Sequence, residues 1–425
     1  MTKVYLQTHG CSTNLSESEV MSGLLLKAGF NVTLSPEEAD VIIINICTVK
    51  GEEVGIRDIR KLSEYKKPLV IAGCVPKYML KSIREVSGDA SIITTHNIEN
   101  IVEIVEETLN GNSVELMVNK SDIKIGMPRV RRNKVIGIVP ISSGCLGDCS
   151  YCSVKLIKGA LKSYPQDMIV REVLDAVNQG CKEIWITSQD NGAYGMEDND
   201  KSQLPQLMKA ILGIRQDFKV RIGMMNPEHL WPVIDEMIEI YKNPRVFKFL
   251  HIPVQSGNDE ILEKMNRKYN VMQFERIIER FKQAIPNITI STDLIVGFPG
   301  ETEEQFNDSL NLVRKIMPGV LNISRFQPRP RTRAAHMEGQ LHGRDTKERS
   351  RLVTDIFQNI SRMNNERWLG WKGEVLIDEI GKDNTLIGRN FAYKPVIIRS
   401  VAKLGDRVNV TIEDISVFDL RGRVI

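Results

Sequence analysis

Three cysteines lie within eight residues of one another in the segment Gly144-Cys145-Leu146-Gly147-Asp148-Cys149-Ser150-Tyr151-Cys152. Closely spaced cysteine thiolates hold iron–sulfur clusters, and this spacing can wrap one face of a cubane. Three ligands for four irons leave one iron open to bind a substrate. The alternatives are a chance grouping or a zinc site, but zinc prefers paired CxxC units with a fourth ligand, and no fourth Cys or His is near in sequence. We therefore predict a catalytic cluster on Cys145, Cys149 and Cys152.

Three further cysteines, Cys11, Cys47 and Cys74, are too far apart for their spacing alone to indicate chemistry. Their placement indicates more, because each lies at or just beyond the carboxyl end of an expected strand: Lys3–Thr8, Val41–Ile46 and Pro68–Ala72. In a parallel sheet these ends lie on one edge, where ligands bind. Two interpretations stay open at this point: three thiols that converge on a second cluster, or three separate buried cysteines.

The first hundred residues supply the elements that must position this second group of cysteines. Short apolar runs alternate with helical patterns, which predicts a parallel sheet covered by helices. Ser16 and Glu19 are spaced as a capping box and predict the start of a helix that Gly29 ends. We assign residues 1–114 to this N-terminal domain. Residues 115–134 carry six basic and two acidic residues, a net of +4, and predict either a linker with a basic surface or an ordinary solvated connection.

A second α/β array, residues 135–364, surrounds the first group of cysteines. Asn226 before Pro227 and Thr302 before Gln305 predict helix starts, and a long helix is expected over Asp345–Leu369. Repeated βα units indicate a partial parallel barrel, a (β/α)6 arrangement whose site lies at the carboxyl ends of the strands. Its six expected strands are Ile136–Ile141, Glu183–Thr187, Val220–Met224, Phe247–Pro253, Ile288–Val296 and Leu321–Phe326.

Residues 365–425, the last part of the chain, have a different sequence pattern from the α/β array before them. Short apolar runs punctuated by Gly and Asn predict a small all-β barrel. Its expected strands are Gly373–Ile377, Val396–Ile398, Arg407–Ile412 and Ser416–Leu420. The fold class is therefore α/β multidomain, with a parallel-sheet N-terminal domain, a partial barrel and a small C-terminal β-barrel.

Composition narrows the class of protein. The chain has 425 residues, 42% of them hydrophobic, which is ample for packed cores. The net charge is only +3, so affinity for nucleic acid must come from local patches. Seven cysteines without a secretion signal predict a reducing cytoplasm, where we expect Cys181 to be a buried structural thiol. The longest apolar run is too short to span a bilayer, so no membrane association is expected.

Several long motifs, in order, resemble one known family. The CxxxCxxC of Cys145, Cys149 and Cys152 is the radical-SAM motif, and the chain around it resembles the methylthiotransferases over nearly its whole length. The segments that carry the resemblance are Thr8-His9-Gly10-Cys11-Ser12-Thr13-Asn14, Asn45-Ile46-Cys47-Thr48-Val49-Lys50, Ala72-Gly73-Cys74-Val75-Pro76, His251-Ile252-Pro253-Val254-Gln255-Ser256-Gly257 and Asp293-Leu294-Ile295-Val296-Gly297-Phe298-Pro299-Gly300. The C-terminal barrel resembles a TRAM domain, an RNA-binding module.

Other segments resemble one branch of that family. Thr187-Ser188-Gln189-Asp190-Asn191-Gly192, Gly223-Met224-Met225-Asn226-Pro227 and Cys47-Thr48-Val49-Lys50 are similar to the archaeal and eukaryotic members, which act on threonylcarbamoyladenosine of tRNA. Eukaryotic members carry a C-terminal membrane tail, and this sequence, which stops at Ile425, is more similar to the archaeal type. One stretch departs from the family pattern, since Arg331 and Arg333 stand where the family has Gly and Pro.

The resemblance implies a function and its cofactors. It implies two 4Fe-4S clusters, one on Cys145, Cys149 and Cys152 and one on Cys11, Cys47 and Cys74, together with S-adenosyl-L-methionine. A radical formed from that cofactor would remove hydrogen from C2 of threonylcarbamoyladenosine at position 37 of tRNA, and the second cluster would carry the sulfur that replaces it. The partners implied are tRNA, a reducing electron donor and a sulfur source.

Polar side chains at the expected strand ends are candidate contacts of S-adenosylmethionine. Each can instead be an ordinary strand-end or helix-cap residue, Asn226 in particular. Tyr151 is expected to shield the cluster or to pack in the core. The candidates are Tyr151, Thr187, Ser188, Gln189, Asp190, Arg221, Asn226, Gln255, Ser256, Asp293 and Gly297.

A basic run without an acidic residue, Arg325, Arg329, Arg331 and Arg333, is a candidate contact for tRNA phosphates or an ordinary solvated surface. Two other enzyme functions stay open: methylthiolation of a ribosomal protein, or of isopentenyladenosine in tRNA. A function of another class also stays open, an iron–sulfur redox-sensing RNA-binding protein without turnover.

Overall fold

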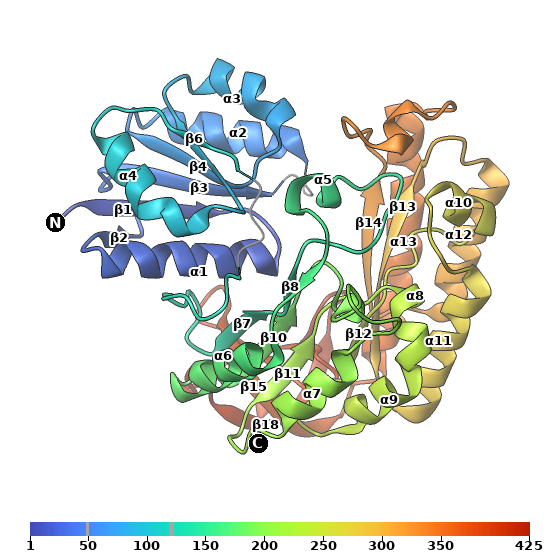
Figure 1. Cartoon of the computed structure of the whole chain (residues 1–425). Helices are drawn as coiled ribbons and strands as arrows, with labels where there is room; N and C mark the ends of the chain where they lie inside the picture. Colours follow the sequence, from blue (N-terminus) through green and yellow to red (C-terminus); the bar gives the residue numbers. More distant parts are fainter. Residues whose placement is uncertain (48–50, 119–122) are drawn as a thin grey trace.

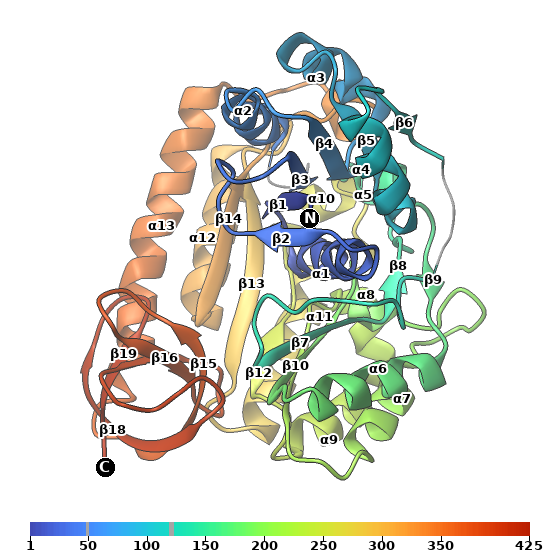
Figure 2. The same ribbon diagram turned by 90° about the vertical axis from the view of Figure 1, so that its left-hand side faces the viewer.

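The computed structural model describes residues 1–47, 51–118 and 123–425. Figure 1 shows an N-terminal α/β domain and an open barrel of parallel strands with helices outside it, and Figure 2 shows a small C-terminal β-barrel. The predicted fold class is confirmed. No helix that the structure describes is both long and apolar enough to cross a bilayer.

The N-terminal domain is a six-stranded parallel sheet with helices on both faces. The strands β3 and β4 are buried along their whole length and are apolar except for Asn45, as expected for a parallel sheet covered on both sides. Helices α1 (Ser12–Lys27) and α4 (Ile101–Leu109) pack on one face, and α2 (Glu52–Ser63) and α3 (Leu80–Val86) pack on the other. The strand order is β2 (Asn31–Thr33), β1 (Lys3–Thr8), β3 (Val41–Cys47), β4 (Leu69–Cys74), β5 (Ser91–Thr94) and β6 (Glu115–Leu116).

The predicted start of the first helix is wrong. Helix α1 begins at Ser12, directly after Cys11, and Ser16 and Glu19 lie inside it. Both side chains are buried where α1 meets the second domain, and the Ser16 hydroxyl accepts a hydrogen bond from Arg129 Nη1 at 3.2 Å. Tertiary contacts therefore explain the polar residues that resembled a cap.

The described basic side chains of the linker, for which the sequence predicts either a basic surface or an ordinary solvated connection, divide between buried and exposed positions. Arg129 and Arg131 are buried beside Glu19 and Glu172, with Arg129 Nε 2.9 Å from Glu172 Oε1, and Lys124 is buried against Glu17. These basic side chains join the N-terminal domain to the barrel. Arg132 and Lys134 line a cavity of about 1080 Å³ between α1, the strand from Ile136 and the C-terminal barrel. Residues 119–122 lie outside the described part of the chain.

The second domain is an open barrel of the six predicted parallel strands. They form two sheets, β7-β10-β11 and β12-β13-β14, and backbone hydrogen bonds from Val220 N to Arg245 O (2.7 Å) and from Phe247 N to Val220 O (2.9 Å) connect them. Helix α1 packs against the edge strand β7 (Figure 1). The strands are β7 (Ile136–Pro140), β10 (Glu183–Thr187), β11 (Lys219–Ile222), β12 (Phe249–His251), β13 (Thr289–Val296) and β14 (Val320–Arg325).

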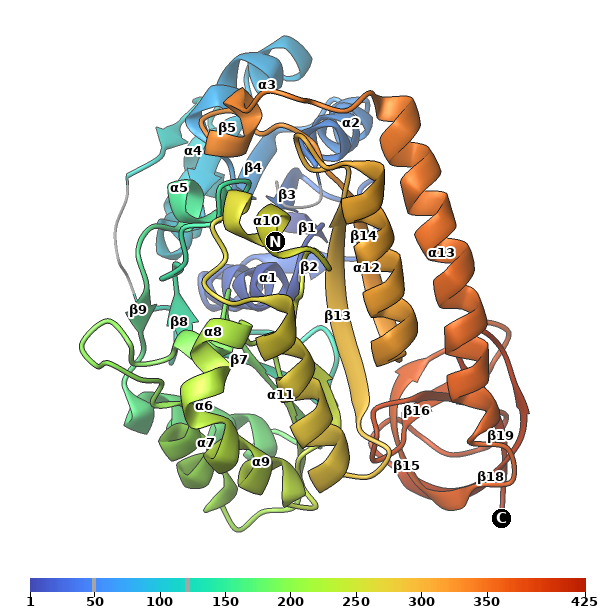
Figure 3. The ribbon, with the colours of Figure 1, turned by 90° about the vertical axis from the view of Figure 1, so that its right-hand side faces the viewer.

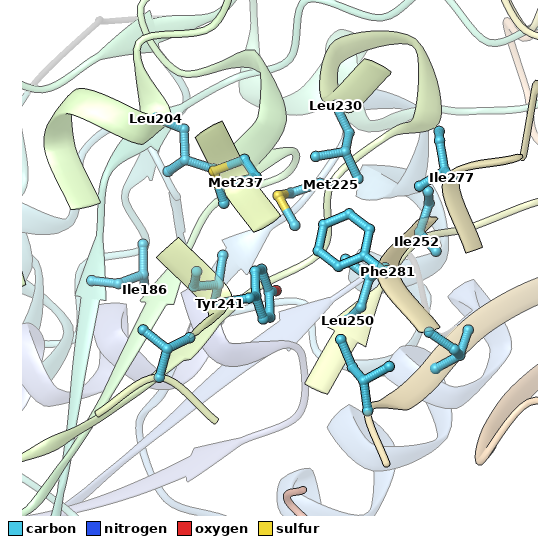
Figure 4. Close-up of a cluster of buried hydrophobic side chains, with 14 of the residues drawn as sticks. Ile186, Leu204, Met225, Leu230, Met237, Tyr241, Leu250, Ile252, Ile277 and Phe281 are labelled. Carbon is cyan, nitrogen blue, oxygen red and sulfur yellow. The ribbon is translucent and has the colours of Figure 1, made fainter. Parts of the chain in front are cut away.

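Helices on the outside of this barrel bury its hydrophobic core. In Figure 4 side chains from several of these elements point toward one another, and Tyr241 and Phe281 meet edge to face with ring centroids 5.4 Å apart. Thr302 and Gln305 form the predicted capping box of α12. The helices are α6 (Gln166–Asn178), α7 (Leu204–Leu212), α8 (Pro227–Leu230), α9 (Ile234–Lys242), α10 (Asp259–Lys264), α11 (Val271–Ala284) and α12 (Glu303–Ile316).

A long helix, α13 (Gly343–Glu366), runs beside α12 and leads to the C-terminal barrel (Figures 2 and 3). That barrel closes in the order β15-β16-β17-β19-β18. The last predicted strand is wrong, because Ser416 Oγ accepts hydrogen bonds from Phe418 N and Asp419 N and forms a turn there. The strands are β15 (Lys372–Ile380), β16 (Leu386–Arg389), β17 (Pro395–Ile398), β18 (Arg407–Ile415) and β19 (Leu420–Val424).

The C-terminal barrel closes the amino-terminal end of the open barrel through a buried polar contact. Tyr393 Oη donates a 2.7 Å hydrogen bond to Glu183, which is fully buried at the start of β10. Arg389 pairs with Asp378 at 2.9 Å beside them. Burial, followed by repulsion from Asp378, raises the pKa of Glu183 to about 7.

Glu183 therefore predicts a pH-dependent stability. Its pKa in the folded chain exceeds the ordinary value of 4.5, so the folded state binds the proton more tightly and stability falls as pH rises between about 4.5 and 7. Glu183→Gln removes this effect and should stabilise the protein at about pH 8 by up to about 3 kcal/mol, with little change near pH 5. Thermal unfolding across that range measures it. Glu103→Gln, at an exposed position on α4, is the control; an equal response of the two variants would contradict the prediction.

Candidate active site

The loop that carries Cys145, Cys149 and Cys152 turns tightly against the start of the barrel. Gly144 has φ +71°, and a Cβ atom there would lie 1.9 Å from Ala160 O, so only glycine fits. A Cβ atom on Gly147 would lie 3.6 Å from Cys145 Sγ and 3.8 Å from Cys149 Sγ. Two of the three sulfur atoms therefore lie close to Gly147, where a side chain would contact both of them.

This sulfur set fits an iron–sulfur cluster. Burial raises the pKa of Cys145 to about 12 and raises that of Cys152, so these groups favour the thiol until a metal binds them. Arg267 Nη1 donates a hydrogen bond to Cys149 Sγ at 3.0 Å and supplies a cation to the same group. Within residues 1–47, 51–118 and 123–425, no three Cys, His, Asp or Glu side chains are arranged to hold a single metal ion.

A buried hydrogen-bond network supports Arg267 from the strand ends. Arg267 Nη2 donates to Asn226 Oδ1, and Asn226 Nδ2 donates to Asp190 Oδ2 at 2.6 Å. Asp190 also accepts from Asn226 N and Gly192 N, each at 3.0 Å, and lies 2.6 Å from His229 Nδ1. Burial by itself would raise the pKa of Asp190, but the hydrogen bonds from His229 and Asn226 outweigh it, so this pKa lies below its usual value. The network joins two predicted site residues, Asp190 and Asn226, to Cys149.

The second group of cysteines converges at the carboxyl edge of the N-terminal sheet. Cys47 and Cys74 end β3 and β4 in register, and Cys11 lies at the start of α1. Hydrogen bonding with Cys47 lowers the pKa of Cys11 to about 5 and also lowers that of Cys74, while the same contacts raise that of Cys47. Asn14 lies between them, 3.3 Å from Cys11 Sγ and 4.0 Å from Cys74 Sγ. The structure brings the three side chains together at this edge, and the second cluster itself stays a prediction. Three adjacent thiols at a ligand-binding edge are a donor set that fits a second cluster.

The fold brings the two groups of cysteines to one interface. Ser12, next to Cys11, shares a 2.5 Å hydrogen bond with Thr187 at the carboxyl end of β10. Gln189 and Thr13 line one small pocket from opposite sides of that interface. Helix α5 (Val154–Lys158), which follows the first group, meets the N-terminal domain where His96 Nε2 lies 2.7 Å from Ile157 O.

The remaining predicted cofactor contacts divide into two sets. Asp293 faces the inside of the barrel, 3.0 Å from His251 Nε2 and 2.6 Å from Asn322 Nδ2. Gln255, with φ +70°, joins β12 to β13 through its backbone. Ser188 has a buried hydroxyl without a hydrogen-bond partner among the described residues, which leaves it able to bind a ligand.

Four predicted contacts, Arg221, Ser256, Gly297 and Tyr151, make packing or backbone contacts in the structure. Arg221 points toward the C-terminal barrel and lies 5.1 Å from the ring of Trp185 and 5.2 Å from that of Tyr393. Ser256 is fully buried and its hydroxyl accepts a hydrogen bond from Asn258 N. Gly297, at φ +75°, makes room for Thr346 of α13, which a Cβ atom would approach to 2.3 Å. Tyr151 packs edge to face on Phe298, with centroids 6.5 Å apart.

Arg325 ends strand β14, and the other three arginines lie in the segment that follows it, which contacts Asp148 and Ser153. Arg325, Arg331 and Arg333 are exposed, and Arg333 pairs with Asp148 of the cysteine loop at 3.1 Å. Arg329 is half-buried and donates a hydrogen bond to Ser153 Oγ at 3.3 Å. This segment therefore presents positive charge and also braces the first group of cysteines.

Sequence reasoning missed three residues of this site. No local pattern predicts a role for Arg267 or Lys158. His251 lies in a family motif, but that motif gives no role for its side chain. Each is found only through its contact with a residue distant in the chain. The motif residues Thr48–Lys50, which contributed to the resemblance, lie outside the described residues.

Comparisons with known proteins agree with this geometry. The radical SAM superfamily model matches residues 139–313, the TRAM domain model matches residues 369–425, and the model of uncharacterized protein family UPF0004 matches residues 3–95. A protein of Methanothermobacter thermautotrophicus described as a probable threonylcarbamoyladenosine tRNA methylthiotransferase is 39% identical over 93% of each chain. The chain belongs to the threonylcarbamoyladenosine tRNA methylthiotransferase family.

A further member of the family and a solved structure are also similar to this chain. The human threonylcarbamoyladenosine tRNA methylthiotransferase is 36% identical over the whole of this chain and 74% of its own length. The radical S-adenosylmethionine methyltransferase TsrM from Kitasatospora setae has a TM-score of 0.55 at 14% identity, over 79% of this chain and 75% of TsrM. That likeness supports the fold.

Proposed function

We propose that this enzyme converts N6-threonylcarbamoyladenosine at position 37 of tRNA into its 2-methylthio derivative. The observation that carries the proposal is the meeting of two cysteine groups at one interface, where Ser12 bonds to Thr187. Family membership supplies the substrate. The alternatives with a ribosomal protein or isopentenyladenosine as substrate find no support among the named relatives.

Cys145, Cys149 and Cys152 would hold a 4Fe-4S cluster, which together with S-adenosylmethionine supplies a radical able to attack an unactivated C–H bond. The protein's own part is to hold the cofactor and the substrate in position and to exclude water from the site. Arg267 holds Cys149, and Asp190 and Asn226 hold Arg267 in turn. Thr187, Ser188, Gln189, Gln255 and Asp293 stay candidate contacts for the cofactor, since they lie at the carboxyl ends of the strands.

Cys11, Cys47 and Cys74 would hold a second 4Fe-4S cluster that delivers the sulfur atom. The observations that support it are the register of Cys47 with Cys74 and the contacts of Asn14 with Cys11 Sγ at 3.3 Å and with Cys74 Sγ at 4.0 Å. An electron donor and a sulfur source are required as partners. All seven cysteines are free thiols, which fits the cytoplasm, where thiols stay reduced and tRNA is found.

Nucleoside mass spectrometry tests this function. A strain that lacks the gene should accumulate threonylcarbamoyladenosine in its tRNA and lose the methylthio form, and a plasmid copy should restore it. An unchanged level of the methylthio nucleoside would contradict the proposal. Reconstituted protein with dithionite and S-adenosylmethionine should also form 5′-deoxyadenosine, and its absence would favour the redox-sensing alternative.

The exposed arginines predict a salt-dependent affinity for tRNA. Arg325→Ala and Arg331→Ala should each weaken binding and reduce the slope of log Kd against log salt by about 1, because each removes one phosphate contact. Filter binding over a range of salt concentrations measures the slope. Arg171→Ala, at an exposed position on the outer helix α6, is the control and should leave the slope unchanged. A parental slope near zero would contradict the arginine contacts.

A further inference from the structure

We propose that Lys158 is a positioning residue of the sulfur-delivering centre: it places a buried ammonium group beside Cys11, Cys47 and Cys74 as the counter-charge to the anionic group they hold. The proposal rests on the proposed function, because that function assigns the second cluster to these cysteines. It assigns a role to a residue of the barrel domain in a site otherwise built by the N-terminal domain.

Lys158 reaches that site because of its place in the chain. It is the last residue of α5, six residues after Cys152, and its side chain is only 6% exposed. Its Nζ lies 3.4 Å from Glu17 Oε1 of α1. The neighbouring Ile157 carbonyl contacts His96, so α5 is held against the N-terminal domain at two successive residues. The segment that follows the first group of cysteines thus delivers a cation to the second.

The partners of Glu17 place this cation next to the cysteines. Glu17 lies one helical turn after Asn14, whose side chain contacts Cys11 Sγ and Cys74 Sγ. Glu17 also accepts a hydrogen bond from Thr95, and Thr95 N donates to Gly73 O, beside Cys74, at 2.8 Å.

The charges of this buried group do not balance among the side chains alone. Lys124 Nζ lies 2.7 Å from Glu17 Oε1, the same oxygen that Lys158 approaches, while Glu17 Oε2 has no hydrogen-bond partner among the described residues. Two ammonium groups therefore share one carboxylate, which leaves a net charge of +1. A buried unpaired charge is costly, so an anion must lie close to it. The group held by Cys11, Cys47 and Cys74 would supply that anion.

A purely structural role, in which Lys158 only docks α5 through Glu17, makes a different prediction. In that case Lys158 affects stability but not the electronic properties of the cluster. Net charge near an iron–sulfur cluster sets its reduction potential. The potential of the second cluster therefore separates the two roles without any measurement of activity.

The test uses full-length chain with Cys145, Cys149 and Cys152 all changed to Ala, so that electron paramagnetic resonance reports the second cluster alone. Lys158→Met should lower the midpoint potential by at least 59 mV, a tenfold change in the one-electron equilibrium, because a nearby cation favours the reduced cluster. Lys158→Arg should keep the parental value. Lys155→Met removes the same charge from an exposed position of the same helix and should leave the midpoint unchanged.

A midpoint in Lys158→Met equal to that of the parent, at equal iron content, would overturn the inference and leave the second cluster in place. Glu17→Gln provides an independent variant if Lys158→Met does not fold, and it should shift the midpoint in the opposite direction; a shift of the same sign or none would also overturn it. If the parent binds no iron through the remaining cysteines, the assignment of the second cluster fails, and the role of Lys158 fails with it.

Discussion

A Cys74→Ala variant should still form 5′-deoxyadenosine but make no methylthiolated tRNA. Cys74 is buried at the end of β4, in hydrogen-bond contact with Cys47, and belongs to a different domain from the loop of Cys145 to Cys152. Its loss should therefore remove the sulfur-delivering centre and leave the radical-forming centre intact. Iron content should fall by half, and the methylthio nucleoside should fall below detection. Mass spectrometry of the tRNA and chromatography of 5′-deoxyadenosine measure both products in one reaction.

Cys181→Ala is the matched control for this experiment. Cys181 is fully buried in the core of the barrel domain, so iron content and both products should stay at the parental level. Cys74→Ala protein that retains full iron, or that still methylthiolates tRNA, would show that Cys74 is not a ligand of the second cluster.

Asp190→Asn should destabilise the protein by about 3–5 kcal/mol, the usual cost of removing one partner from a buried charged network. Asp190 is 2% exposed. It accepts hydrogen bonds from the backbone N–H groups of Gly192 and Asn226 and from the side chains of Asn226 and His229. An amide at this position turns a donor toward one of these donors in either orientation. The pKa of Asp190 is below its usual value, so its stabilising effect is present at neutral pH and is lost as pH falls through that lowered value.

The same substitution should reach the first group of cysteines, because Asn226 connects Asp190 to Arg267 and Arg267 donates to Cys149. We expect reconstituted Asp190→Asn protein to bind less iron than the parent. Denaturant titration and iron analysis measure the two effects. Asp198→Asn, on the exposed loop that follows, should change neither. If the Asp190→Asn variant is as stable as the parent, the hydrogen bonds of Asp190 do not stabilise the fold as predicted.

Local patterns were sufficient to predict the fold where one physical rule dominates. Short, mainly apolar runs such as Val41–Ile46 are typical of strands buried in a sheet that is covered on both faces, and Cys47 and Cys74 lie at the ends of these strands as predicted. Thr302 and Gln305 form their capping box because both hydrogen-bond partners lie within one turn. Prediction failed where long-range contacts compete with local ones. Ser16 and Glu19 match a capping box, yet Arg129 and Arg131 draw them into an interface.

The cysteine motif and the order of the domains follow from the sequence alone, since they depend on residue type, short spacing and periodicity. The partners of the cysteines do not. Arg267 lies 118 residues from Cys149, and Lys158 lies 141 residues from Glu17. No local rule relates residues so far apart: the packing of α5 on α1 brings Lys158 to Glu17, and the folding of the barrel domain brings Arg267 to Cys149. The tertiary structure likewise decided that Arg221, a predicted contact at the cofactor end of the barrel, lies among aromatic rings toward its other end.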